Sequence, residues 1–379
     1  MNLMTDTTYW ITIAHLERWG YERINDLIIK VYHENKSNWE TFFELQEIDW
    51  KNKYNLSEIQ IKDLLNAKNN LPNNSFLAED LISQGYEVIP INSPDYSKTL
   101  KLNLKKASPP VLYIKGNKQI MQENSIAIVG SRDANETSLQ FTDNIANLAS
   151  KEYKVIVSGF AKGVDKQALD SSIKYKGQSI IVLPQGITTF SSGFKKYYKE
   201  LVAGDVLVLS TFHPKAVWNV GLAMARNPII YGLSKEIYVA QSSDSGGTWQ
   251  GVMDGLKKGR IIFVRKPEDK EKSANSLLIK AGAVAVDFNG NNIEQTKKEI
   301  VINPEQINSK PQTIEEQILF ALKNKPLTAK QLIDFLNLQL TTQKLSSLLK
   351  KINYIEPIEK TRPQIFKIRD DKFQVTLFR

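Results

Sequence analysis

The chain has 379 residues, enough for two or three domains, and its 41% hydrophobic and 24% charged residues are ordinary for a soluble globular protein. It has no cysteine, which excludes disulfides, thiolate zinc sites and a cysteine nucleophile. The formal net charge of +9 suits a polyanionic partner, although a generic basic surface gives the same sum.

Targeting and catalytic signals are missing from the sequence. The first residues lack a basic segment followed by an apolar one, and no apolar run approaches ~20 residues, so we expect no signal peptide, no membrane span and a cytoplasmic protein. The three histidines, His15, His33 and His213, show no metal spacing, and no nucleophile–base pair stands out. We therefore expect no metal, no cofactor and no enzyme activity.

In chain order, residues 1–85 have the helical spacing of apolar side chains, with Ser57 as one cap, and predict a small helical docking domain. Residues 86–290 then alternate strands with helices, which predicts an α/β domain with a parallel, doubly wound sheet. The predicted strands are 87–90, 111–115, 126–130, 154–157, 179–183, 205–209, 236–240, 260–264 and 283–286.

Residues 291–312 are rich in Asn, Gln, Lys and Pro and are predicted to be a linker. In residues 313–379, a capping-box pattern at Thr313 opens one helix, and Thr328 and Thr341 open two more. Two apolar segments then flank a polar turn at 359–363. Three helices followed by a hairpin predict a winged helix, which binds duplex DNA or docks a protein.

Two turns of small residues follow predicted strands and carry one cation each. The first is Gly130-Ser131-Arg132, and the second runs from Ser158 to Asp165 and contains Gly159, Lys162 and Gly163. Because the carboxyl ends of parallel strands share one edge, backbone N–H groups and positive charge should meet there, as a phosphate site requires. Alternatively, Arg132 pairs with a surface carboxylate. We assign Asp165 to the N-cap of the following helix.

Further candidates lie beyond the next strands. Lys195 and Lys196 precede Tyr197 and Tyr198, a mixture that suits single-stranded nucleic acid, although a solvated helix start explains it equally well. Arg226 is a further candidate for phosphate binding. Another glycine turn, Ser245-Gly246-Gly247-Thr248, lies between a predicted strand and a helix. Thr248 is suited to bind a phosphate or to cap the helix.

The ordered set of motifs resembles the DprA/Smf family. The set comprises Pro109–Asn117, Ile126–Arg132, Val157–Asp165, Ala225–Asn227 with Gly232–Ser234, and Ser245–Thr248 with Gly259 and Arg260. The resemblance implies an extended Rossmann-like core between an N-terminal helical (SAM-like) domain and a winged helix. It also implies a homodimer that binds single-stranded DNA and loads a RecA-type recombinase during natural transformation. It maps DNA contacts onto Arg132 and onto Lys195 or Lys196, with Lys162 and Arg226 in a basic pocket.

The chain also departs from the family pattern. Ala168-Leu169 stands where the family has Ala-His, Ser210-Thr211 where it has Ser-Glu, and Arg265-Lys266-Pro267 where it has Pro-Gly. These changes remove a His and a Glu from the pocket region and are expected to leave it more positive. The alternative is a nucleotide-binding sensor or a nucleotide-derivative hydrolase on the same fold, in a role such as defence against mobile DNA.

Overall fold

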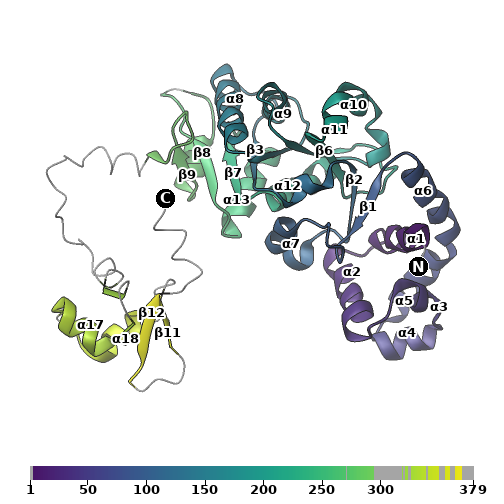
Figure 1. Cartoon of the computed structure of the whole chain (residues 1–379), viewed down its shortest axis with the longest axis horizontal. Helices are drawn as coiled ribbons and strands as arrows, with labels where there is room; N and C mark the ends of the chain where they lie inside the picture. Colours follow the sequence, from purple (N-terminus) through teal and green to yellow (C-terminus); the bar gives the residue numbers. More distant parts are fainter. Residues whose placement is uncertain are drawn as a thin grey trace. The chain divides into compact units, whose positions relative to one another are not determined.

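The computed structural model describes residues 3–269, 271–293, 318, 321–322, 326–338, 340–349, 355–358 and 363–368. The chain divides into two compact units, Met1–Lys297 and Lys298–Arg379, each of which is described by itself (Figure 1). Among these described residues, no helix combines the length and hydrophobicity that crossing a membrane requires.

The first unit begins with short helices, as the apolar spacing predicted. They pack around Trp10, Trp39 and Trp50, which are fully buried. The predicted Ser57 cap is confirmed, because its side chain accepts a hydrogen bond from the backbone N–H of Gln60. The helices are α1 (Leu3–Ala14), α2 (Tyr21–Ile28) with a π-helical turn (Ile29–Glu34), α3 (Trp39–Glu44), α4 (Glu47–Tyr54), α5 (Glu58–Asn69) and α6 (Leu71–Ser83).

A nine-stranded sheet follows, and each predicted strand in it is present within two residues of its predicted ends. The strands are β1 (Glu87–Pro90), β2 (Val111–Gly116), β3 (Ser125–Val129), β4 (Val155–Ser158), β5 (Ser179–Val182), β6 (Val206–Ser210), β7 (Glu236–Val239), β8 (Ile262–Arg265) and β9 (Val284–Val286). The intervening α-helices are α7 (Lys98–Leu104), α8 (Glu136–Lys151), α9 (Val164–Lys174), α10 (Ser191–Lys196), α11 (Tyr198–Ala203), α12 (Val220–Leu233), α13 (Gly246–Lys257) and α14 (Asn275–Lys280).

The prediction of a parallel sheet is correct for the seven strands that pair parallel to one another, and wrong for β2, which runs in the opposite direction and pairs antiparallel on both sides. The strand order is β1-β2-β6-β5-β4-β3-β7-β8-β9; β2 runs antiparallel to both β1 and β6, and the strands from β6 to β9 run parallel. Chain length explains the reversal. An antiparallel β2 ends at the edge where β3 begins, roughly 19 Å away over four strand spacings, and residues 117–124 can reach about 26 Å.

Helices cover both faces of the sheet, as expected for strands that are apolar throughout. Ile126 and Ile128 of β3 pack with residues of α8 and α9, whereas the alternate residues Ala127 and Val129 belong to the core that includes α12 and α13. Figure 1 shows these two helix pairs on opposite sides of the sheet. The carboxyl ends of β3, β4 and β7 therefore open into turns that lie between two helical layers.

The second unit contains a three-stranded antiparallel sheet and helical segments among its described residues. The elements with described bounds are β10 (Leu327–Thr328), α17 (Ala329–Leu336), α18 (Thr342–Leu349), β11 (Ile355–Pro357) and β12 (Ile365–Ile368), with the strand order β10-β12-β11, and residues 318, 321 and 322 are also helical. Thr328 caps α17 as predicted. The capping box predicted at Thr313, most of the linker 291–312 and most of the turn 359–363 lie outside the described residues.

His15 joins the N-terminal helices to the sheet. Its Nε2 lies 2.8 Å from the Tyr113 hydroxyl of β2, and its ring contacts that of His213 at 5.2 Å between centroids. Burial, with a smaller effect from His213, lowers the pKa of His15 to about 3. The folded chain thus keeps this imidazole neutral where an unfolded chain would protonate it.

Stability should therefore fall as the pH falls. Below the unfolded pKa of 6.5 the unfolded state binds a proton that the folded state refuses until about pH 3. In the parent chain, urea unfolding should show a lower free energy of unfolding at pH 5 than at pH 8. In His15→Gln this difference between the two pH values should be smaller by roughly 2 kcal/mol. The matched control is the exposed His33→Gln, which should keep the full loss. An unchanged loss in His15→Gln would contradict this assignment.

Candidate functional site

A cavity of about 380 Å³ lies where the turn after β3 meets α12 and the start of α13. It brings together eight of the predicted site residues: Gly130, Ser131, Arg132, Arg226, Ser245, Gly246, Gly247 and Thr248. Sequence reasoning did not single out other side chains that line it, among them Val220 and Met224. These two residues belong to an ordinary apolar helix pattern, which carries no signal of a ligand.

The turn after β3 is shaped by close packing. A Cβ on Gly130 would lie 2.6 Å from Cγ2 of Val164, so only glycine fits without a shift. The backbone N–H of Ser131 donates to the Gln241 carbonyl oxygen at 2.9 Å, which ties this turn to the end of β7. Arg132 is exposed at the rim of the cavity and makes no ion pair with a described residue.

The turn after β4 supports the cavity more than it lines it. Ser158 is buried and donates to the Ile128 carbonyl oxygen at 2.8 Å. Gly163 has φ +81°, and a Cβ there would lie 2.4 Å from the Ser131 carbonyl oxygen. Lys162 points to solvent and lies 3.5 Å from Asp133. Four predicted site residues of this turn do not line the cavity: Ser158, Gly159, Lys162 and Gly163.

A buried ion pair forms the floor of the cavity. Nη2 of Arg226 lies 3.7 Å from Oδ2 of Asp165, and its Nη1 donates to the Val182 carbonyl oxygen at 3.0 Å. The prediction that Asp165 caps its helix is wrong: Gly163 occupies the cap position and Asp165 lies inside the first turn. The carboxylate is needed there because a buried guanidinium requires a counter-charge.

Two buried polar atoms at this floor have no hydrogen-bond partner among the described residues, Nε of Arg226 and the hydroxyl of Tyr231. Burial raises the pKa values of Asp165 and Tyr231, and it lowers the pKa of Arg226. Unpartnered buried groups are uncommon, and water or a ligand usually satisfies them. In the part of the chain that is described, no group of acidic or histidine side chains has the arrangement of a metal site.

The start of α13 supplies backbone donors to the same cavity. Ser245 is the N-cap residue but makes no side-chain capping bond, and Gly246 has φ +83°. The first N–H groups of a helix lack intrahelical acceptors and attract anions. The cavity therefore combines these donors with the fixed positive charge of Arg132.

The structure does not bring the lysines of α10 to the cavity. Lys195 and Lys196 are exposed, and Nζ of Lys196 lies 3.8 Å from Asp170 and 4.8 Å from the centre of the Tyr197 ring. Tyr197 is buried, so of the two tyrosines only Tyr198 is exposed. These residues form a separate basic surface.

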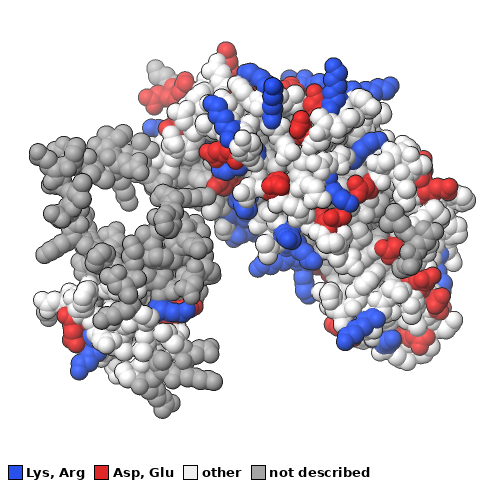
Figure 2. All heavy atoms as spheres, in the orientation of Figure 1, with Lys and Arg blue, Asp and Glu red and all other residues white. Residues whose placement is uncertain are grey.

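Basic side chains are also numerous on the helices near this surface. Figure 2 shows Lys and Arg gathered over the region of α8, α9 and α10. The exposed lysines near the carboxyl ends of the strands include Lys162, Lys166, Lys195 and Lys196, whereas Lys151, Lys174 and Lys176 follow the helices to the amino ends of the strands.

Arg265, which stands at one of the departures from the family pattern, adds no free charge. It is buried at the end of β8, where it pairs with Glu271 and donates to Ser138 Oγ at 2.9 Å. Ala168 and Leu169 are buried in the core. The departures from the family pattern are therefore mostly packed inside the protein.

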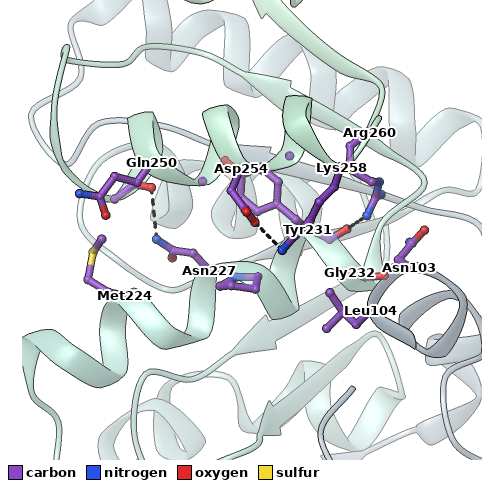
Figure 3. Close-up of a pocket in the computed structure, with 14 residues that line it drawn as sticks. Asn103, Leu104, Met224, Asn227, Tyr231, Gly232, Gln250, Asp254, Lys258 and Arg260 are labelled. Atoms are coloured by element: carbon purple, nitrogen blue, oxygen red, sulfur yellow. Dashed lines mark hydrogen bonds and ion pairs between the residues drawn. The ribbon is translucent and has the colours of Figure 1, made fainter. Parts of the chain in front are cut away.

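A second, smaller cavity of about 200 Å³ lies between α12, α13 and the end of α7 (Figure 3). Its charged groups already have protein partners. Lys258 pairs with Asp254 at 2.7 Å, and Nη1 of Arg260 donates to the Tyr231 carbonyl oxygen at 2.7 Å. It offers less unpaired charge to a ligand than the cavity beside Arg132.

Comparisons with known proteins agree on one family. The family model described as DNA recombination-mediator protein A matches residues 87–301, more than half of the chain. DNA processing protein DprA of Streptococcus pneumoniae is 30% identical over 156 residues, 41% of this chain and 55% of that protein. DNA processing protein DprA of Bacillus subtilis is 30% identical over 181 residues, 48% of this chain and 60% of that protein. The match thus spans little more than half the length of these relatives.

A solved structure shares the fold. The X-ray structure of DNA processing protein A (DprA) from Streptococcus pneumoniae aligns with a TM-score of 0.60 at 23% identity, covering 76% of this chain and 97% of that one.

The two arginines at the cavity should behave differently in unfolding experiments. Arg226→Met leaves Asp165 buried without its partner and should cost about 3–5 kcal/mol of unfolding free energy. Arg132→Met removes an exposed side chain and should change stability by less than about 0.5 kcal/mol. Urea unfolding of both variants measures the difference. Equal losses would show that Arg226 does not hold the floor of the cavity.

Proposed function

Because the chain belongs to the DNA recombination-mediator protein A family, we propose that it binds single-stranded DNA through its phosphates at the cavity beside Arg132. It acts as a binding protein rather than an enzyme. It also passes the strand to a RecA-type recombinase and works as a homodimer, two proposals that rest on the family alone.

The observation that carries the proposal is the convergence of Arg132 and the first turn of α13 on one cavity. A guanidinium and free backbone N–H groups recognise phosphate oxygens whatever the base. The exposed Lys195, Lys196 and Tyr198 extend the basic surface with an aromatic ring, as single strands require. Such contacts give affinity without sequence readout.

The alternative ligand is a small nucleotide. It is favoured by the glycine turn Ser245-Gly246-Gly247-Thr248 at the cavity, because such a turn suits the phosphate of a mononucleotide equally well. At 100 times its dissociation constant a nucleotide would add about 2.7 kcal/mol of stability. A stabilising nucleotide, with no stabilising oligonucleotide, would replace the single-stranded DNA proposal.

Fluorescence anisotropy with a single-stranded oligonucleotide and its duplex, across a salt series, tests the proposal. We expect preference for the single strand and a falling affinity as salt rises. Arg132→Ala and the double variant Lys195→Ala with Lys196→Ala should each weaken binding, and the double variant should reduce the log–log salt slope by about 1.4, at ~0.7 per phosphate contact. The control is Lys151→Ala, an exposed lysine at the opposite edge of the sheet, which should bind normally. Unchanged affinity in both binding-site variants would refute the site.

We further propose that residues 313–379 form a winged helix that docks a protein. Its support is the arrangement of α17 and α18 with a three-stranded antiparallel sheet. Removing residues 305–379 should leave affinity for single-stranded DNA within about twofold, because the phosphate site lies in the first unit. Titration with a duplex provides the second readout: if the truncated chain loses duplex binding, the segment is a DNA-binding module instead.

A further inference from the structure

An exposed apolar segment lies directly before α12. Val217 is 75% exposed, Trp218 46% and Val220 67%. Trp218 differs in this respect from the other tryptophans, because Trp10, Trp19, Trp39 and Trp50 are buried and Trp249 packs partly buried against the core. Exposed apolar side chains that gather on one segment commonly mark an interaction surface.

Hydrogen bonds hold the segment in place on both sides of Trp218. The backbone N–H of Gly186 donates to the Ala216 carbonyl oxygen at 2.8 Å, and the Thr188 hydroxyl donates to the Pro214 carbonyl oxygen at 2.7 Å. On the other side, Asn219 Oδ1 accepts from the backbone N–H of Leu222 at 2.8 Å and caps α12. The indole is thus carried on an anchored backbone.

The segment borders the cavity beside Arg132. Val220 lines that cavity together with Arg132 and the start of α13, and Trp218 precedes it by two residues. The exposed Lys215 lies on the same segment. The indole makes no hydrogen bond and no ring contact with the residues that the structure describes. A free aromatic face therefore lies close to a site suited to phosphate.

We propose that Trp218 stacks on a base of the single strand whose phosphate is held beside Arg132, with Val217 and Val220 extending the apolar surface. The inference rests on the proposed function. In a single strand each phosphate is followed within one nucleotide by an unpaired base, and aromatic rings bind such bases whatever their identity. Arg132 then holds the backbone while Trp218 holds a base.

Tryptophan fluorescence and anisotropy test the inference on the full chain. A single-stranded oligonucleotide should quench the emission, and Trp218→Phe should abolish most of the quenching while it keeps most of the affinity, because phenylalanine also stacks. Trp218→Ala should weaken binding roughly 5- to 150-fold with no change in the melting temperature. The matched control is Tyr153→Ala, which removes a 90% exposed ring at the opposite edge of the sheet and should bind normally.

The outcomes separate this inference from the proposed function. If the parent chain binds the oligonucleotide by anisotropy but Trp218→Ala binds equally well and no quenching occurs, Trp218 does not stack and only this inference fails. If the parent chain binds no oligonucleotide, both fail. An oligonucleotide with abasic sites adds a positive check: its affinity should drop for the parent chain and not for Trp218→Ala.

Discussion

The buried guanidinium of Arg226 is the interaction on which the arrangement of the site depends. It contacts Asp165 of α9 and the Val182 carbonyl oxygen of β5, so a single side chain from α12 links three elements. It also explains a glycine, because a Cβ on Gly159 would lie 1.5 Å from Arg226 Nη1. Since burying a charge is favourable only with matched partners, the turn after β4 and the first turn of α9 are positioned around this side chain.

That constraint divides the two arginines by role. Arg226 pairs with Asp165 and donates to a backbone carbonyl, whereas Arg132 is exposed at the rim of the cavity. The charge that remains for a ligand therefore comes from Arg132 and from the first N–H groups of α13. Such donors recognise a phosphate by charge and geometry and are indifferent to the base attached to it. An adjacent aromatic face supplies what the phosphate site lacks, a contact to the base itself.

The strand positions and eight residues of the cavity follow from the sequence, because apolar runs and glycine turns are local signals. The burial of Arg226 and of Arg265 could not be predicted in the same way. Arg226 pairs with Asp165, which lies about 60 residues earlier in the chain, and Arg265 pairs with Glu271, which lies in the following loop. The antiparallel direction of β2 also escaped prediction, since strand direction is a property of the whole sheet. Trp218 was not predicted as a site residue, because a short apolar segment of sequence does not reveal whether its side chains are buried or exposed.

The reversed β2 also bears on how the chain folds. Its neighbour β6 is separated from it by residues 117–205, which include β3, β4 and β5. Pairing such distant segments has a large entropic cost of loop closure, and this cost falls once the strands between them have formed. We therefore expect the parallel strands to assemble first and β2 to join the sheet afterwards, bringing β1 with it. His15 contacts Tyr113 on β2, so the N-terminal helices, although first in the sequence, find their docking surface only after the middle of the chain has folded.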